Sequence, residues 1–369
     1  MRVRLVTSLR EFDALAPLWL EITRQSGQIS PFLSHDWFAC CWRTAGPDRR
    51  REAWLFENSH RLMAIVPLAS WRTSVRSLPV RVLGVLDSPD TPFVEFPSVG
   101  PIEEVVETFL ATLREKGGWD VLRFSNLPAH SLTFKALGSA LTDRFPWRVV
   151  RREQSPYLRL SGTWESFYRA KTQRFRKTCR SMENRIRGYG EVSVEEHCQV
   201  DPEGSLLREV VEISRLSWKG PRGLALATMQ GMSRFFRELT QRASTNGWLH
   251  LWVLRLNSQA VATEYQIGTD GQLHALRADF DPAFGTLSPG AYLNLSIIRS
   301  LFERQGVDRY NMGPGANDYK LRWASDADEV VGLEVYAPTP YGRFLHAIET
   351  RVVPIARRWR TQVTRRRCA

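Results

Sequence analysis

The stretch 248–305 constrains the fold of this chain more than any other part of the sequence. It holds three apolar segments with the length and alternation of strands, at 248–256, 260–268 and 272–281. Two-residue segments that favour hairpin turns join them, Asn257-Ser258 and Asp270-Gly271. A loop at 282–290 then leads into a helix expected over 291–305. A meander followed by a helix predicts a mixed sheet in an α+β fold.

Shorter patterns on both sides of the meander extend this plan. Helices are expected before it at 205–218 and 232–244, and a strand, a short helix and a last strand after it at 307–313, 318–323 and 330–336. In the first half the clearest element is an amphipathic helix at 102–116. A length of 369 residues suits two domains. We expect an N-terminal domain, a C-terminal domain and a basic tail, at 1–152, 153–340 and 341–369.

The composition is that of a folded globular protein, with 43% hydrophobic and 24% charged residues. No apolar run is long enough for a signal peptide or a membrane span, so a cytoplasmic location is expected. The five cysteines form no CxxC pair and no spacing typical of a zinc site. We therefore expect reduced thiols and no metal.

Basic residues are concentrated in two places, within a net charge of +12 that predicts anionic partners. In 171–187, apolar residues at helical spacing predict a helix with one buried face and exposed charges: Phe175, Cys179, Met182 and Ile186. A solvated face, an anionic glycan, a nucleotide-linked acceptor, tRNA and a membrane surface are each consistent with this helix. The tail at 341–369 has the pattern of a basic amphipathic helix, which predicts peripheral association with the inner membrane face.

Two stretches resemble a known family. RADFDPAFGTLSPGAYLN at 277–294 and NMGPGANDYKLRWA at 311–324 look like the signature of GNAT-like acyltransferases associated with cellulose and exopolysaccharide biosynthesis. That family is similar in turn to the Fem aminoacyl transferases, which join two GNAT-like domains in one chain. The resemblance implies two GNAT-like domains, each a mixed, mostly antiparallel sheet flanked by helices, with the acyl chemistry in the second. Nothing in the sequence shows an internal repeat directly.

The loop before the expected helix at 291–305 is the predicted donor site. A GNAT enzyme holds the phosphates of acyl-CoA at a helix N-terminus, where unpaired N–H groups and the helix dipole attract anions. With acetyl-CoA as the expected donor, we predict that six residues contact it: Thr286, Ser288, Gly290, Ala291, Tyr292 and Asn311. The loop lacks the glutamine- and arginine-rich glycine pattern usual in GNAT enzymes, so a loop without a ligand is the alternative.

Three charged residues of the meander are candidates for catalysis or substrate binding. If the turn at Asp270-Gly271 has two residues, Glu264 lies opposite Arg277 in the hairpin, and Asp279 shares the face of Arg277. We predict Glu264 or Asp279 as the general base toward an amine or hydroxyl acceptor, with Arg277 binding substrate. A cross-strand ion pair without a catalytic role is the alternative.

The remaining candidates lie in YKLRW and SWKG. The resemblance to the Fem transferases implies that Lys320 stabilises developing negative charge. The resemblance to GNAT enzymes implies that Tyr319 or Tyr292 protonates the leaving thiolate or alkoxide. An exposed lysine without a role is the alternative. Trp218 and Lys219 end a helix beside the expected acceptor groove and are predicted to bind substrate, although core packing explains Trp218 equally well.

Three functions follow as hypotheses. The first is transfer of an acyl group from acyl-CoA to an amine or hydroxyl of a sugar or polysaccharide precursor. The second is Fem-like transfer from aminoacyl-tRNA, with the basic helix binding the RNA. The third is a non-catalytic partner of a polysaccharide-synthesis complex that keeps the fold.

Overall fold

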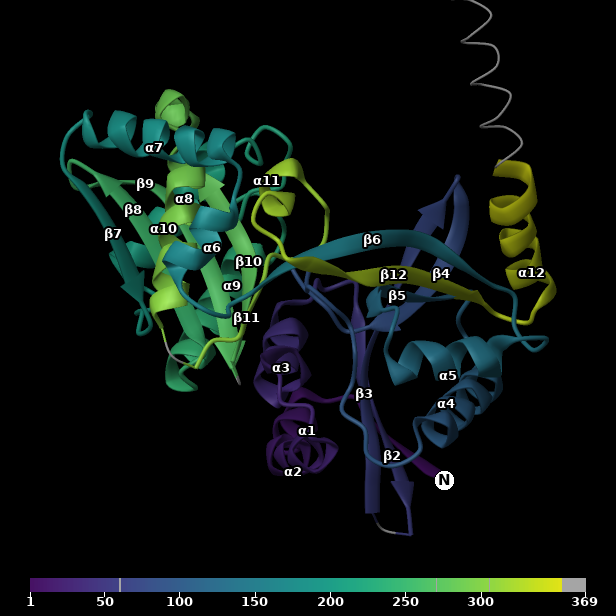
Figure 1. The fold of residues 1–369 in the computed structure, drawn as a ribbon. Coiled ribbons are helices and arrows are strands. Elements are labelled where there is room, and N and C mark those ends of the chain that lie inside the picture. The colour runs from purple at the N-terminus through teal and green to yellow at the C-terminus, as the bar shows by residue number, and fades with distance from the viewer. Residues whose placement is uncertain (60, 270, 305, 354–369) are drawn as a thin grey trace, which may run out of the picture.

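The computed structural model describes residues 1–59, 61–269, 271–304 and 306–353. Its N-terminal lobe contains the strands β1 (Arg2–Val6), β2 (Arg50–Asn58), β3 (Arg61–Val75), β4 (Leu78–Val85) and β5 (Val121–Pro128). Its helices are α1 (Leu9–Asp13), α2 (Ala16–Ser26), α3 (His35–Thr44), α4 (Ile102–Lys116) and α5 (Leu132–Leu141). Helices α1 to α3 lie on the side of the C-terminal lobe, and α4 and α5 lie on the other side of the strands (Figure 1).

The C-terminal lobe contains the predicted meander and the helices around it. Its strands are β7 (Val192–His197), β8 (Leu249–Leu256), β9 (Gln259–Thr269), β10 (Gln272–Phe280) and β11 (Arg309–Asn311). Its helices are α6 (Trp164–Ala170), α7 (Gln173–Arg187), α8 (Ser205–Leu216), α9 (Met232–Thr245), α10 (Pro289–Glu303) and α11 (Asp318–Leu321), with the 3-10 turn η2 (Pro282–Leu287) before α10. Helices α8 and α9 contact one face of the meander, and α10 contacts the other with α7 beside it.

Two long strands join the lobes into one sheet. β12 (Asp326–Tyr336) pairs with β5 on one side and with β6 (Trp147–Arg159) on the other, and the last residues of β6 pair with β11. Both strands cross between the lobes in Figure 1. The twelve strands therefore run in the order β1-β2-β3-β4-β5-β12-β6-β11-β10-β9-β8-β7. The expected domain boundary between residues 152 and 153 falls inside β6, and β12 completes the N-terminal lobe, so the division at that point stays a prediction.

The largest apolar core runs through both lobes. Trp37 of α3 packs edge to face against Phe235 of α9, with ring centroids 5.4 Å apart, and both rings are almost fully buried. A second core lies between α10, α7 and the other face of the meander. Because apolar packing and a shared sheet both connect the lobes, the side chains between them are held at fixed separations.

Several local predictions are confirmed. The helix expected at 102–116 is α4, and Ser34 caps α3 by accepting a hydrogen bond from the Trp37 backbone at 3.1 Å. Cys179, Met182 and Ile186 form the buried face of α7, as the spacing predicted, whereas Phe175 is only half-buried, against Trp323. Helix α10 begins at Pro289 rather than Ala291, because proline suits the first helical position.

The C-terminal segment is described as far as residue 353. Helix α12 (Pro340–Ala347) and the π-helical turn η3 (Ile348–Val352) pack beside β4 and β12, where Tyr341 donates a hydrogen bond to the Pro79 carbonyl at 2.7 Å. Most of the tail expected to be a basic amphipathic helix, 354–369, lies outside the described residues. In the part of the chain that the structure describes, no helix is both long enough and apolar enough to span a bilayer.

Candidate active site

The predicted pairing of Glu264 with Arg277 is wrong, because β10 contains a bulge. The two strands follow the expected register from their turn up to Ala275. The register then shifts by one residue and leaves Leu276 without a partner, so that Arg277 faces Tyr265. A shift of one residue moves the following side chains to the other face relative to the partner strand. Glu264 and Arg277 therefore lie on opposite faces of the sheet.

Arg277 and Asp279 share a face, as predicted, and form a buried charge cluster. Their side chains are 4% and 2% exposed, and Arg277 Nε donates to Asp279 Oδ2 at 3.1 Å. Arg277 Nη1 also donates to Asp90 Oδ2 of the N-terminal lobe at 3.0 Å. Lys219 Nζ lies 2.8 Å from Asp279 Oδ1; burial lowers the pKa of Lys219, and the charge of Asp279 opposes that shift. The cluster brings Arg277, Asp279 and Lys219 together and joins the two lobes.

Glu264 lies on the face that packs against α10, in a different environment. Its carboxylate accepts hydrogen bonds from the Tyr310 hydroxyl and from Gln266 Nε2, the latter at 2.7 Å, and from Asn294 of α10. Burial raises the pKa of the Glu264 carboxyl, and these hydrogen bonds only partly offset that effect. Glu264 does not line the cavity between the two lobes, so its position does not favour the predicted role as general base.

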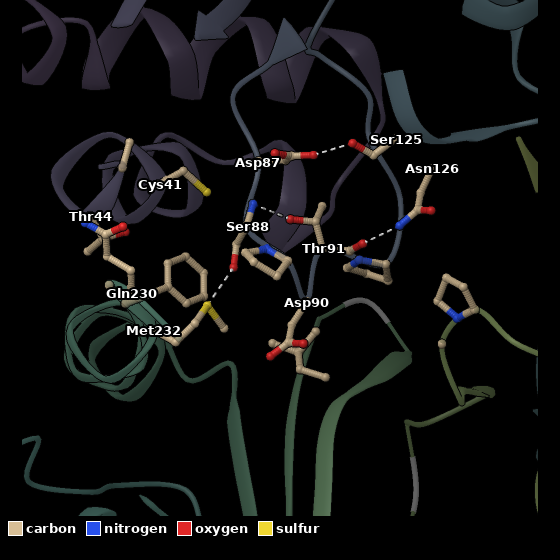
Figure 2. Close-up of a pocket in the computed structure, with 18 of the residues that line it drawn as sticks. Cys41, Thr44, Asp87, Ser88, Asp90, Thr91, Ser125, Asn126, Gln230 and Met232 are labelled. Atoms are coloured by element: carbon tan, nitrogen blue, oxygen red, sulfur yellow. Dashed lines mark hydrogen bonds between the residues drawn. The ribbon is translucent and has the colours of Figure 1, made fainter. Parts of the chain in front are cut away.

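A cavity of about 620 Å³ lies between the lobes where β10 bulges. The C-terminal lobe contributes Leu276 of the bulge, the turn after β11 and Lys320, and the N-terminal lobe contributes the end of α3 and the loop after β4. Figure 2 shows this loop crossing the cavity, with Asp87 near Ser125 and Asp90 directed toward the strands of the C-terminal lobe. Polar groups of both lobes therefore line the same cavity as Leu276, whose backbone has no partner in β9.

Lys320 is the buried cation of this cavity. The residue is 6% exposed, and its Nζ donates to the carbonyl oxygens of Gly313 at 3.0 Å and Pro314 at 2.9 Å. Burial lowers the pKa of Lys320 to about 8, although the charge of Glu264 acts in the opposite direction. Lys320 is thus not the exposed lysine of the alternative interpretation. A buried ammonium with two fixed acceptors suits the stabilisation of negative charge.

The loop at 86–92 was missed by the sequence analysis. Asp87 accepts a hydrogen bond from Ser125 at 2.6 Å, and the Ser88 backbone donates to Thr91 Oγ1 at 2.8 Å (Figure 2). Burial raises the pKa of both Asp87 and Asp90. Two aspartates in a proline-rich loop after an apolar strand were a signal, but their position beside β10 depends on contacts between the lobes.

The start of α10 has the geometry of an anion site. Ser288 adopts a left-handed conformation and makes no side-chain cap, and the Tyr292 backbone donates to Ser288 at 3.1 Å. The N–H groups of Gly290 and Ala291 have no acceptor among the described residues. A Cβ at Gly290 would come within 3.1 Å of the Phe280 ring, so the chain is close-packed there. Thr286 is exposed in η2 beside these groups.

Helix α7 brings basic side chains to the neighbourhood of η2. Tyr189, just after α7, packs edge to face on Phe284 of η2 with centroids 5.9 Å apart, and α7 also contacts α10. Five basic side chains of α7 outside its buried stripe are exposed: Arg174, Lys177, Arg180, Arg185 and Arg187. A positive surface therefore lies beside the start of α10.

The other predicted site residues differ in how far they are exposed and in what they contact. Tyr319 is 50% exposed next to Lys320, whereas Tyr292 is 8% exposed within the second core. Asn311 donates to the Leu273 carbonyl at 3.3 Å and ties β11 to β10. Trp218 is 51% exposed, so core packing does not explain it.

Among the residues that the structure describes, one side-chain group resembles a metal site, although the sequence predicted none. Ligand atoms of Glu196, Cys198 and His250 lie within 4.8 Å of one another at the end of β7. Arg304 donates to the Glu196 carboxylate and lies 3.2 Å from His250 Nδ1. Because Nδ1 is the atom that would bind the metal, the guanidinium competes with a cation for this position.

The chain is similar to acetyltransferases in sequence over its second half and in fold over most of its length. Residues 173–321 match the sequence model of the family described as acetyltransferase (GNAT) domain. No curated protein sequence matches the chain. The structure of FemX aligns with a TM-score of 0.57 at 10% identity, covering 94% of this chain and 100% of that one.

Two further structures show the same architecture. A protein of unknown function from Bacteroides thetaiotaomicron VPI-5482 aligns with a TM-score of 0.56 at 12% identity, covering 91% of this chain and 100% of that one. A tandem GNAT protein from the clavulanic acid biosynthesis pathway aligns with a TM-score of 0.51 at 12% identity, covering 92% and 99%. The chain thus has a double GNAT-like fold, and its second half is similar in sequence to an acetyltransferase (GNAT) domain, which supports an acyltransferase of the GNAT superfamily.

Proposed function

We propose that the protein transfers an acyl group, acetyl in the first instance, from acyl-CoA to an amine or hydroxyl of a sugar or polysaccharide precursor. The observation that carries the proposal is Lys320, a buried cation on a cavity that also contains the unpaired Leu276 of the bulge. The resemblance of 277–294 and 311–324 to the exopolysaccharide-associated family supports the acceptor class. Action at the inner membrane face belongs to the same proposal and rests on the basic pattern of 341–369.

The residues suit direct transfer of an acyl group between two bound substrates. Gly290 and Ala291 would hold donor phosphates through their free N–H groups, with the cations of α7 nearby. Lys320 would stabilise the negative charge that develops on the carbonyl oxygen, together with the backbone freed at Leu276. Asp90 would take the proton that the acceptor loses as its bond to the acyl carbon forms and the carbon–sulfur bond breaks. The leaving thiolate receives a proton from solvent or from Tyr319.

Calorimetric titration with acetyl-CoA tests the donor site. Gly290→Val places a branched side chain where a single Cβ already lies 3.1 Å from Phe280, and it covers the free N–H groups. We expect acetyl-CoA binding to fall at least tenfold in this variant. Gly138→Val in α5 is the matched control, because a Cβ there meets no atom within 4 Å. Absence of binding by the unmodified protein would contradict acyl-CoA as the donor and favour a non-catalytic partner or another donor.

The basic surface of α7 favours a second candidate, transfer from aminoacyl-tRNA. Its exposed cations lie beside η2 and α10, where a tRNA phosphate backbone would be bound together with the acyl group. Titration with tRNA at several salt concentrations separates the two donors. Binding that weakens steeply with salt and is lost in Arg174→Gln/Lys177→Gln/Arg180→Gln, without a response to acetyl-CoA, would replace the first candidate by the second.

A further inference from the structure

We propose that a cationic groove on the N-terminal lobe binds phosphate groups of the acceptor, whose reacting amine or hydroxyl then enters the cavity between the lobes. The inference deepens the proposed function and rests on it, since it names the acceptor as a phosphate-bearing molecule. It is carried by unpaired arginines in one groove and by the connection of this groove to the cavity.

The groove is an open depression of about 1360 Å³ around the start of β2. The loop before β2, the β3 and β4 strands, the end of α4 and the outer side of α9 form its walls. Eight basic and three acidic side chains line it among the described residues. Such an excess of one sign focuses a positive potential in the groove and attracts anions.

Most of these cations have no carboxylate partner. Within the described part of the chain, no carboxylate oxygen lies within 4.0 Å of the charged nitrogens of five of them: Arg49, Arg50, Arg51, Arg72 and Arg234. The others are paired, Arg43 with Asp13 at 2.7 Å, Arg81 with Asp120 at 2.7 Å and Lys116 with Glu52 at 2.5 Å. The groove therefore keeps an unbalanced positive charge after its internal ion pairs are formed.

Two of the unpaired arginines lie on or against β3. Arg72 lies directly opposite Arg81 in the β3–β4 ladder, and like charges at directly opposite positions destabilise a sheet. The Arg49 guanidinium lies over the ring of Trp71, 4.4 Å from its centroid, which limits its side-chain freedom. A bound anion would meet a guanidinium that is already oriented at Arg49, and it would offset the charge that Arg72 adds beside the Arg81–Asp120 pair.

The groove and the cavity between the lobes meet at Asp48 and Arg49, which line both. A ligand that extends past these two residues would occupy both spaces. Guanidinium groups bind both carboxylate and phosphate through two parallel hydrogen bonds, but a phosphate or diphosphate offers more charge and more acceptor oxygens to several arginines at once than a single carboxylate does. A nucleoside diphosphate-linked acceptor and a lipid phosphate-linked acceptor present the same chemistry, with the phosphates in the groove and the acyl-accepting end in the cavity.

Binding of inorganic pyrophosphate, uridine diphosphate and phosphatidylglycerol vesicles tests the groove. The variant Arg49→Gln/Arg50→Gln/Arg72→Gln removes three unpaired cations from it. Its control, Arg10→Gln/Arg24→Gln/Arg114→Gln, removes the same charge from exposed arginines that line neither the groove nor the cavity. We expect the groove variant to bind at least one of these probes roughly tenfold to a hundredfold more weakly than the unmodified protein, and the control to bind within about twofold.

The outcomes distinguish the source of the phosphate and the two proposals. Selective loss of uridine diphosphate binding supports a nucleotide-linked acceptor, and selective loss of vesicle binding supports a lipid-linked one. Equal weakening of both variants, or no binding by the unmodified protein, would overturn the groove. Because the probes contain no acyl donor, groove binding together with an absent response to acetyl-CoA would contradict the proposed function while leaving the phosphate site in place.

Discussion

The two faces of the β9–β10 hairpin bury charged residues in opposite ways. On the face of α8 and α9, Arg277 lies between Asp279 and Asp90, so every charge has a partner of opposite sign. On the face of α10, Glu264 has hydrogen-bond donors but no cation within ion-pair distance among the described residues, and burial raises its pKa. The bulge at Leu276, which has no partner in β9, is the reason that Arg277 and Glu264 lie on opposite faces. Burial alone therefore does not identify a catalytic carboxylate; its partners decide whether it is charged.

Arg277→Met gives the largest expected loss of stability. It leaves Asp279 and Asp90 buried with one cation fewer, and removal of one partner from a buried ion pair typically costs about 3–5 kcal/mol. Urea unfolding followed by circular dichroism measures the change. The control is Arg144→Met, whose exposed pair with Glu107 is worth about 0–1 kcal/mol. Equal effects of the two substitutions would show that the Arg277 cluster does not hold the lobes together.

Lys320→Met tests the buried cation of the cavity between the lobes. Loss of one donor to a developing oxyanion lowers turnover by about a hundredfold to a thousandfold. Thiol release from acetyl-CoA with an amino sugar as acceptor measures the rate, and acetyl-CoA binding should change far less. Lys320→Arg keeps the charge and should retain more activity than Lys320→Met. Equal rates for all three proteins would remove Lys320 from the mechanism.

Glu264→Gln gives the smallest expected change, and its size depends on pH. A carboxyl whose folded-state pKa is raised keeps its proton in the folded protein after the unfolded chain has lost it, so its contribution to stability falls as pH rises above about 4.5. The glutamine keeps an oxygen for Tyr310 and Gln266 and does not titrate. The unfolding free energy of the variant should therefore rise relative to that of the unmodified protein between pH 4 and pH 7. A relative loss over that range would show that Glu264 is charged in the folded state.

Local sequence patterns predicted the helices and strands, but they did not predict which residues these elements bring into contact. Helix α4, the Ser34 cap, the buried stripe of α7 and the three meander strands follow from local patterns that act over a few residues. The bulge after Ala275 has no comparable local signal, because β10 contains no glycine or proline there. The single assumption of a regular ladder therefore reversed the face of Glu264 while leaving Arg277 and Asp279 correctly together.

The contribution of the N-terminal lobe to the site was out of reach for the same reason. Asp90 meets Arg277 across 187 positions of sequence, and β12 crosses from the second lobe to pair with β5. Pairing at such separations depends on how the lobes pack. The start of α10 was predicted nearly correctly, because a helix N-terminus is fixed by adjacent residues.

The pH dependence of acyl transfer by the unmodified protein and by Lys320→Arg tests the central claim most directly. Because the protonated ammonium is the active form and burial lowers the pKa of Lys320 to about 8, the turnover of the unmodified protein should fall as pH rises through about 8. The guanidinium of Lys320→Arg stays charged over this range, so its rate should not show that fall. An identical decline in both proteins would contradict the assignment of Lys320 as the residue that stabilises negative charge on the carbonyl oxygen of the transferred acyl group.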